Sequence, residues 1–156
     1  MDIVVNSSPL ILLSKIGRLQ LLNSLFKKVY VPIAVIQEVQ GAGKQNIKFD
    51  QIKFHQLEIV NKLAVQGLLG KLHIGEAEVM IGAIEQGIQS VVLDDSAARG
   101  KAKQLGLDIV GTLGILLAAS KKGILSNLEQ EITNLRNAGM YLSDELITKI
   151  MLSHGK

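Results

Sequence analysis

Short apolar segments alternate with longer segments of helical periodicity along the 156 residues of the chain. The short segments are rich in Val, Ile and Leu and predict strands that are buried on both faces. The longer segments repeat apolar residues every three or four positions, which is the period of a helix with one buried face. This alternation predicts an α/β fold in which helices cover both faces of a central, mostly parallel sheet.

The strand pattern is clearest in four segments and weaker in a fifth. The predicted strands cover residues 3–5, 29–31, 91–93 and 108–110, with 57–60 as a short strand or edge element. Helices are predicted over 7–17, 19–25, 33–39, 62–69, 75–86, 96–105, 112–122, 125–137 and 143–154. Ser7 or Ser8 is the expected cap of the first helix, with Pro9 at its first position. Residues 41–56 are predicted to form a loop or a frayed helix.

The length and composition indicate one domain over residues 1–156, with the helices after about residue 125 packed on it. Aromatic residues make up only 3% of the chain, which argues against an aromatic platform for single-stranded nucleic acid. The chain has no Cys, so disulfides, thiolate metal sites and cysteine nucleophiles are excluded. The sequence shows no signal peptide and no long uninterrupted apolar run, and we expect a cytoplasmic protein without a membrane segment.

Positive charge is unevenly distributed in this chain of net charge +3. Between residues 3 and 37 the cations Lys15, Arg18, Lys27 and Lys28 occur without any acid. A second basic group is centred on Arg99. Local positive potential of this kind favours binding of a polyanion.

Polar side chains with acid or amide groups follow several of the predicted strands. Asn6 comes directly after the first strand, and the adjacent carboxylates Asp94 and Asp95 end the apolar run at 91–93. Three further acids lie on predicted helices: Glu38, Glu76 and Glu78. Because the carboxyl ends of parallel strands lie at one edge of the sheet, where ligands bind in open α/β folds, we expect these groups to converge. The alternative is that Asp94 or Asp95 only caps the helix that begins near Ala97.

Converging carboxylates repel one another unless a cation neutralises them. Oxygen ligands favour a hard ion, Mg²⁺ or Mn²⁺, which binds phosphate oxygens and activates water for attack at phosphorus. Glu76 and Glu78 project about 200° apart on their helix, so one is expected to be a ligand and the other a salt-bridge partner. The alternative is that both only stabilise the helix N-terminus electrostatically. Of the three His residues, only His73 is expected to approach the acids.

Five segments, in this order and spacing, resemble a prokaryotic subgroup of the PIN-domain family. They are VVNSSPLI at 4–11, VP at 31–32 with EV at 38–39, GEAE at 75–78, LDDSAAR at 93–99 and GTLGIL at 111–116. The resemblance covers almost the whole chain and implies a three-layer α/β/α fold with an acidic pocket for Mg²⁺ or Mn²⁺. It also implies cleavage of single-stranded RNA, often by the toxin of a VapBC-like toxin–antitoxin pair, and commonly a homodimer.

The resemblance further implies roles for individual residues. The implied catalytic acids are Glu38, Glu76, Asp94 and Asp95. The implied metal ligands are Asn6, Glu38, Glu76, Glu78, Asp94 and Asp95. Ser7, Ser8 and Thr112 are expected to line the pocket, and Lys15, Arg18 and Arg99 to contact RNA phosphates. An ion pair of Arg99 with Asp95 is the alternative for that arginine.

Asn6 departs from the family pattern, because it stands at the position of the first-strand Asp. An amide offers one oxygen to a metal but carries no negative charge and cannot act as a base. Two functions are therefore predicted: a metal-dependent endoribonuclease, or a PIN-like module that has lost catalytic strength and binds RNA or protein. A phosphoacceptor receiver domain fits less well, since its acid pair would follow the first strand, where this chain has only Asn6.

Overall fold

A five-stranded sheet forms the centre of the computed structural model, which describes residues 1–41, 47 and 49–154. The strands are β1 (Ile3–Val5), β2 (Val29–Pro32), β3 (His55–Leu57), β4 (Ser90–Val92) and β5 (Asp108–Val110). Their order is β3-β2-β1-β4-β5, and every neighbouring pair is parallel. The predicted α/β class is confirmed, and within the described residues the sheet is entirely rather than mostly parallel.

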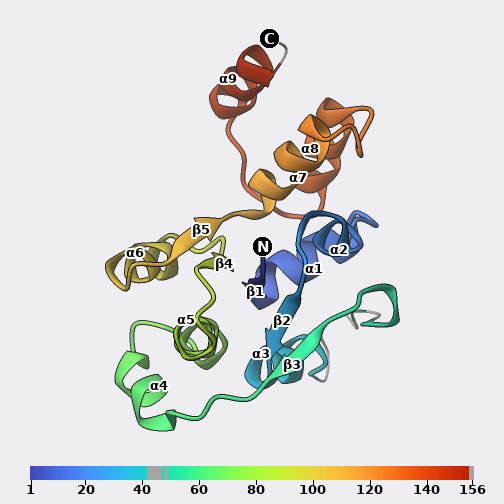
Figure 1. Ribbon diagram of the computed structural model, residues 1–156. Helices are drawn as coiled ribbons and strands as arrows, with labels where there is room; N and C mark the ends of the chain where they lie inside the picture. Colours follow the sequence, from blue (N-terminus) through green and yellow to red (C-terminus); the bar gives the residue numbers. More distant parts are fainter. Residues whose placement is uncertain (42–46, 48, 155–156) are drawn as a thin grey trace.

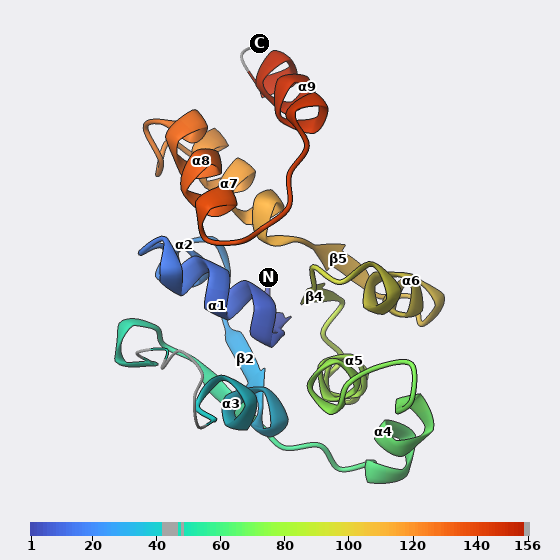
Figure 2. The same cartoon turned by 180° about the vertical axis from the view of Figure 1, so that it is seen from behind.

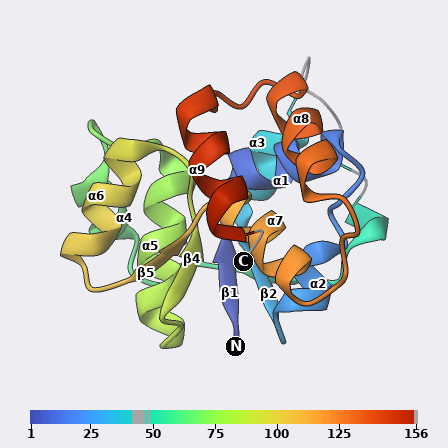
Figure 3. The ribbon, with the colours of Figure 1, turned by 90° about the horizontal axis from the view of Figure 1, so that it is seen from above.

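Helices cover both faces of this sheet (Figure 1). They are α1 (Ser7–Lys15), α2 (Leu21–Leu25), α3 (Ile33–Val39), α4 (Lys62–Leu68), α5 (Ile74–Gln86), α6 (Ser96–Gln104), α7 (Thr112–Lys121), α8 (Leu128–Asn137) and α9 (Asp144–His154), with a short 3₁₀ turn at Phe49–Gln51. Helix α5 packs along β1, β2 and β4 and also contacts α3 and α4. On the other side α7 contacts α1, α2 and α8. Helix α6 lies on the same side as α5 and packs on the edge strand β5 (Figure 3).

The core is aliphatic, as the low aromatic content implies. All residues of β1 and β4 are buried, and the side chains of Val4 and Val91 are fully inaccessible. Close packing of α5 on the sheet depends on Gly82, where an added Cβ would lie 2.5 Å from Cδ2 of Leu57 and 2.9 Å from Cδ1 of Ile59. Burial on both faces explains why the central strands are continuous apolar runs rather than alternating ones.

Local predictions were wrong in two parts of the chain. The strand expected at 57–60 is β3, which covers His55–Leu57, because pairing with β2 sets its register and Val60 is 85% exposed. The predicted loop at 41–56 consequently contains part of a strand, and its residues 42–46 and 48 lie outside the described residues. The N-cap position of α1 is Asn6 rather than Ser7 or Ser8, because Ser7 is already helical.

The strand order creates a switch point between β1 and β4. From β1 the chain continues to β2 on one side, whereas β4 is followed by β5 on the other. The strands run in one direction, so their carboxyl ends lie at the edge of the sheet opposite the N-terminus (Figure 3). The backbone amide of Asn6 donates to the carbonyl of Val92 over 3.2 Å, which holds the ends of β1 and β4 together. In open α/β sheets this is the position at which ligands bind.

The last three helices form an extension beyond β5. Helix α8 packs on α7, and an extended connection leads from α8 to α9 (Figure 2). The hydroxyl of Ser143 accepts a hydrogen bond from the amide of Leu146 and so caps the start of α9. Across the described part of the chain, we find no helix with the length and apolar character needed to cross a membrane.

Candidate functional site

A cleft of about 390 Å³ opens at the switch point, above the carboxyl ends of β1 and β4. It is lined by Asn6, Ser7, Ser8, Glu38, His73, Glu76, Asp94 and Asp95. These residues come from the end of β1, from α1, α3 and α5, and from the segment between β4 and α6. The predicted convergence of acids is therefore present in the fold, and His73 reaches the cleft as expected.

Glu38 and Asn6 lie side by side over the first turn of α5. A Cβ placed on Gly75 would lie 2.8 Å from Oε2 of Glu38 and 3.6 Å from Oδ1 of Asn6. A larger residue at this position would displace the glutamate, so Gly75 allows α5 to approach the two oxygens closely. The amide side chain of Asn6 makes no capping hydrogen bond to α1, although Asn6 is buried. Its oxygen is therefore directed to the cleft rather than used for capping.

Glu76 is held at the base of the cleft by its own helix. Its Oε1 accepts a hydrogen bond of 3.0 Å from the backbone amide of His73, the residue that precedes α5. Glu76 is 8% exposed, so the carboxylate is nearly removed from solvent. Glu76 thus stabilises the helix N-terminus and also lines the cleft.

The adjacent carboxylates Asp94 and Asp95 stabilise two different helices. Asp95 caps α6, because its Oδ2 accepts from the amide of Ala98 over 2.9 Å. Asp94 accepts from Thr112 at the start of α7 through both oxygens, over 2.8 Å from the backbone amide and 2.6 Å from the hydroxyl. Asp95 therefore caps α6, and it also lines the cleft. The position of Asp94 is fixed by α7, and its oxygens keep free lone pairs toward the cleft.

Ser7 has an unsatisfied hydroxyl in the wall of the cleft. The residue is 4% exposed, and its Oγ has no hydrogen-bond partner among the described residues. A buried hydroxyl without a partner costs about 1–3 kcal/mol. This cost indicates a position at which a bound group completes the hydrogen bonding.

Among the predicted ligand and pocket residues, two do not reach the cleft. Glu78 lies on the side of α5 that faces α3, where its Oε1 accepts from the amide of Ala34 over 3.0 Å. It therefore caps α3, and the predicted role of Glu78 as a ligand or salt-bridge partner finds no support here. Thr112 is fully buried behind Asp94 and orients that carboxylate without lining the cleft.

The three predicted RNA-binding cations have different surroundings. Lys15 is exposed, and its Nζ donates to the carbonyl of Ala138 at the end of α8 over 3.2 Å. The guanidinium of Arg99 lies near Asp94, since both Nη1 of Arg99 and Oδ1 of Asp94 would lie 3.3 Å from a Cβ on Gly111. Within the described part of the chain, Arg99 forms no ion pair with Asp95. Of the three cations, Lys15 is the one that lines an open hollow together with acids of the cleft.

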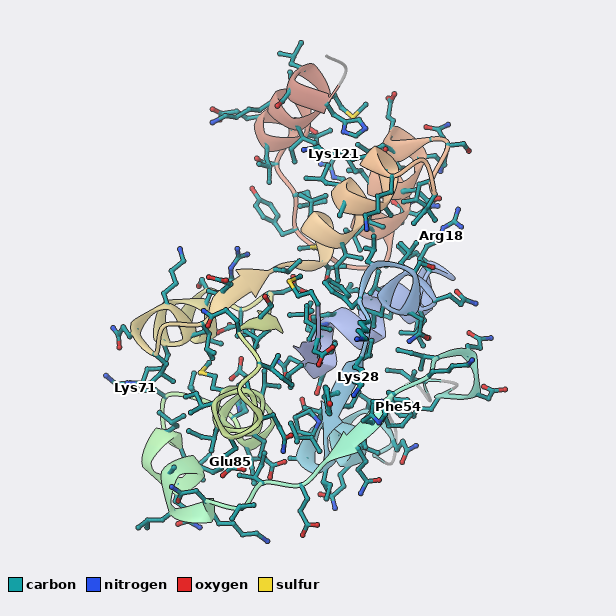
Figure 4. All side chains as sticks on the ribbon, viewed as in Figure 1. Arg18, Lys28, Phe54, Lys71, Glu85 and Lys121 are labelled. Atoms are coloured by element: carbon teal, nitrogen blue, oxygen red, sulfur yellow. The ribbon has the colours of Figure 1, made fainter. Side chains whose placement is uncertain are left out.

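Arg18 is engaged on the far side of α1, against α8 (Figure 4). Its Nε lies 3.1 Å from each oxygen of Glu131, and Nη2 bonds Oε1 as well. The hydrogen bond to Glu131 raises the pKa of Arg18, although desolvation opposes the shift. Glu131 is nearly buried, so the arginine neutralises a charge that solvent does not reach. This pairing argues against the predicted phosphate contact of Arg18.

Replacement of Arg18 by Gln is expected to lower the free energy of unfolding by about 1–2 kcal/mol, because Glu131 loses its charged partner while Arg18 itself is partly exposed. RNA binding should be unchanged. Urea denaturation measures the first effect and an oligonucleotide titration the second. Lys122→Gln, at an exposed cation beyond the end of α7, is the matched control. A loss of RNA affinity without a loss of stability would contradict this structural role.

A second hollow of about 530 Å³ adjoins the cleft and shares Ser7, Ser8, Glu38 and Asp94 with it. Its remaining wall consists of Ile11, Leu12, Lys15, Ala138, Gly139, Met140 and Tyr141. The connection between α8 and α9 thus borders the acids, although Ala138 is 123 positions from its hydrogen-bond partner Lys15. Sequence reasoning missed this connection, because neither its spacing nor its composition points to the strand ends.

The oxygen donors of the cleft fit a hydrated hard cation better than an enclosed one. Among the residues that the structure describes, no three His, Asp or Glu side chains are close enough to enclose a metal ion. Mg²⁺ commonly keeps several waters and is held by one or two carboxylates together with substrate phosphates. The acids of the cleft can supply such carboxylates, and the unpartnered hydroxyl of Ser7 can bond a coordinated water.

Comparison with known proteins places the chain in a family. A family model described as PIN domain (DUF3368) matches residues 2–156, nearly the whole chain. No curated protein shows significant sequence similarity to it.

Proposed function

Because the chain belongs to the PIN-domain family, we propose that it is an endoribonuclease that cleaves single-stranded RNA with Mg²⁺ or Mn²⁺. PIN domains typically bind a divalent metal and are typically nucleases. The observation that carries the proposal is the convergence of Glu38, Glu76, Asp94 and Asp95 in one cleft. Clustered acids of this kind have no packing role that requires all four to face the same open space.

Glu76 and Asp94 would bind the hydrated cation directly and Glu38 would contact it through a coordinated water, with the amide oxygen of Asn6 beside them. When bound, the cation supplies charge neutralisation at the scissile phosphate and lowers the pKa of water. Glu76 and Asp94 are positioned for this role by hydrogen bonds to His73 and Thr112. Their carboxylates are therefore preorganised before substrate arrives.

Glu38 is the best candidate for a general base. Its carboxylate lies in the cleft without a hydrogen bond to any described residue, unlike those of Glu76, Asp94 and Asp95. A carboxylate that no helix terminus engages can accept a proton from an attacking water. Glu38 would thus orient the water and remove its proton, while Asp95 keeps the start of α6 in place at the rim.

Asn6 supports a second function, a PIN-like module that binds RNA or protein with little or no catalysis. The amide removes one negative charge from the cleft and weakens its attraction for a cation. The same amide also lowers repulsion between the cleft and RNA phosphates, which favours retention of a bound strand. The two functions differ in a direct way, since only the nuclease consumes its RNA.

Cleavage of a labelled single-stranded RNA in the presence of Mn²⁺ or Mg²⁺ is the expected result for the wild-type chain. The reaction should stop with EDTA and resume when excess Mn²⁺ is added, because EDTA removes the metal ion that cleavage requires. A duplex of the same sequence serves as the control substrate. RNA that is bound but remains intact with either metal would favour the binding module.

The roles of toxin and homodimer stay predictions from the family resemblance. They would require a partner protein that blocks the acidic cleft, and a second copy of the chain. A small antitoxin-like reading frame immediately upstream would support the first, and sedimentation equilibrium of the purified chain tests the second.

A further inference from the structure

The hollow beside the acidic cleft has the chemistry of a nucleotide subsite. It is continuous with the cleft through Ser7, Ser8, Glu38 and Asp94, so a strand bound at the acids extends directly into it. Its floor is formed by apolar residues of α1, whereas its outer wall carries Lys15 and the connection between α8 and α9. The connection passes on the α1 side of α7 and α8 before it reaches α9 (Figure 2).

Tyr141 is the most exposed large side chain of this wall. It is 88% exposed, although the chain contains only 2 Tyr and 3 Phe residues and no Trp. The other Tyr and Phe side chains of the described residues are buried or half-buried in the domain. An exposed aromatic ring beside this hollow lacks a packing partner among the described residues. Stacking of an unpaired base on such a ring is a common contact in proteins that bind single strands.

Lys15 supplies the charge that a phosphate in this hollow needs. Its Nζ donates to the carbonyl of Ala138 over 3.2 Å, which holds the ammonium at the wall beside the segment that carries Tyr141. An ammonium retains two further donors after this bond. The same bond joins α1 to the end of α8, so the lysine and the tyrosine segment are positioned together.

We propose that Tyr141 and Lys15 form a subsite for one unpaired nucleotide next to the acidic cleft, with the base stacked on the Tyr141 ring and its phosphate at Lys15 Nζ. The subsite rests on the proposed function in that the strand it holds is the RNA presented to the acids. It also explains how a chain so poor in aromatic residues can bind a single strand, because a single exposed ring is enough to stack one base.

Binding of a fluorescein-labelled oligouridylate, measured by anisotropy in EDTA, tests the subsite without cleavage. Tyr141→Ala is expected to weaken binding by about 5- to 150-fold, which corresponds to the loss of one stacked base, while Tyr141→Phe should bind like the wild type. Lys15→Gln should reduce the slope of log K against log salt by about 1, the contribution of one phosphate contact. Val60→Ala, at an apolar residue that is 85% exposed, and Lys62→Gln on α4 are the matched controls.

Oligonucleotide affinity that is unchanged in Tyr141→Ala, or a wild type that binds no oligouridylate, would overturn the subsite. An effect of Tyr141→Ala on self-association alone, with unchanged RNA affinity, would overturn it as well. A wild type that binds through Tyr141 but leaves RNA intact with Mn²⁺ supports the subsite and rejects the nuclease. The two proposals can therefore fail separately.

Discussion

Replacement of Glu38 by Gln is expected to lower the rate of RNA cleavage by about 10²- to 10⁴-fold, the range associated with the loss of a general base. Gln keeps the size of the side chain but neither accepts a proton nor carries the charge that attracts a cation. Initial rates on a labelled single-stranded RNA, measured at saturating Mn²⁺, report this effect. Saturation with metal separates a defect in chemistry from a defect in metal affinity.

The same variant is expected to unfold with a free energy within about 0.5 kcal/mol of the wild type, because Glu38 makes no hydrogen bond to a described residue. Asp94→Asn is a poorer test, since Asp94 also accepts two hydrogen bonds at the start of α7. Glu58→Gln, at an exposed acid directly after β3, is the control for removal of one charge. Undiminished cleavage by Glu38→Gln would remove this residue from the mechanism.

Replacement of Asn6 by Asp is expected to tighten Mn²⁺ binding about tenfold or more, equivalent to about 1.4 kcal/mol. The new carboxylate would lie beside Glu38 over Gly75, where the amide oxygen now stands. With a divalent cation bound, the attraction of the new carboxylate for the metal outweighs its repulsion from the neighbouring acids. Without the metal, only the repulsion remains. Without metal, the variant should therefore be less stable than the wild type, and the difference should disappear as Mn²⁺ is added.

Isothermal titration with Mn²⁺ and the cleavage assay together measure the consequences of Asn6→Asp. Asn61→Asp is the matched control, because Asn61 is also a helix N-cap but lies at α4, outside the cleft lining. If metal binding and cleavage occur only in the Asn6→Asp variant, the natural chain is a binding module. If both proteins cut RNA and the variant is faster, the amide tunes a working nuclease. Equal metal affinity in the two proteins would contradict the placement of Asn6 at the metal.

The central strands and the acids at their ends could be predicted from the sequence. An apolar run such as 91–93 is a strong local signal of a strand buried on both faces, and the strand found there covers Ser90–Val92, with Asp94 and Asp95 shortly after its end. The edge strand was misplaced for the opposite reason. His55 and Gln56 are exposed, and only their pairing with Tyr30 and Val31 makes this segment a strand.

The different roles of the acids could not be predicted from spacing. Glu76 and Glu78 differ by two positions on one helix, yet Glu76 faces the cleft and Glu78 caps α3. Asp94 and Asp95 are adjacent, yet they stabilise α7 and α6 respectively. Glu76 and Asp95 bond the start of their own helices, whereas Glu78 and Asp94 reach the starts of α3 and α7. Which terminus Glu78 and Asp94 reach depends on how the helices pack.

The sequence by itself determined a largely aliphatic α/β domain, a set of acids at strand ends, and an amide at Asn6 in place of the family's first acid. The first two follow from local composition and from the fixed geometry of parallel strands, and the third from the resemblance to the PIN-domain family. Only the tertiary structure decided that Arg18 neutralises Glu131, and that Tyr141 and Lys15 border the same hollow next to the cleft. Such contacts join residues that are far apart in the chain, as the separation of 113 between Arg18 and Glu131 shows, and no local pattern encodes them.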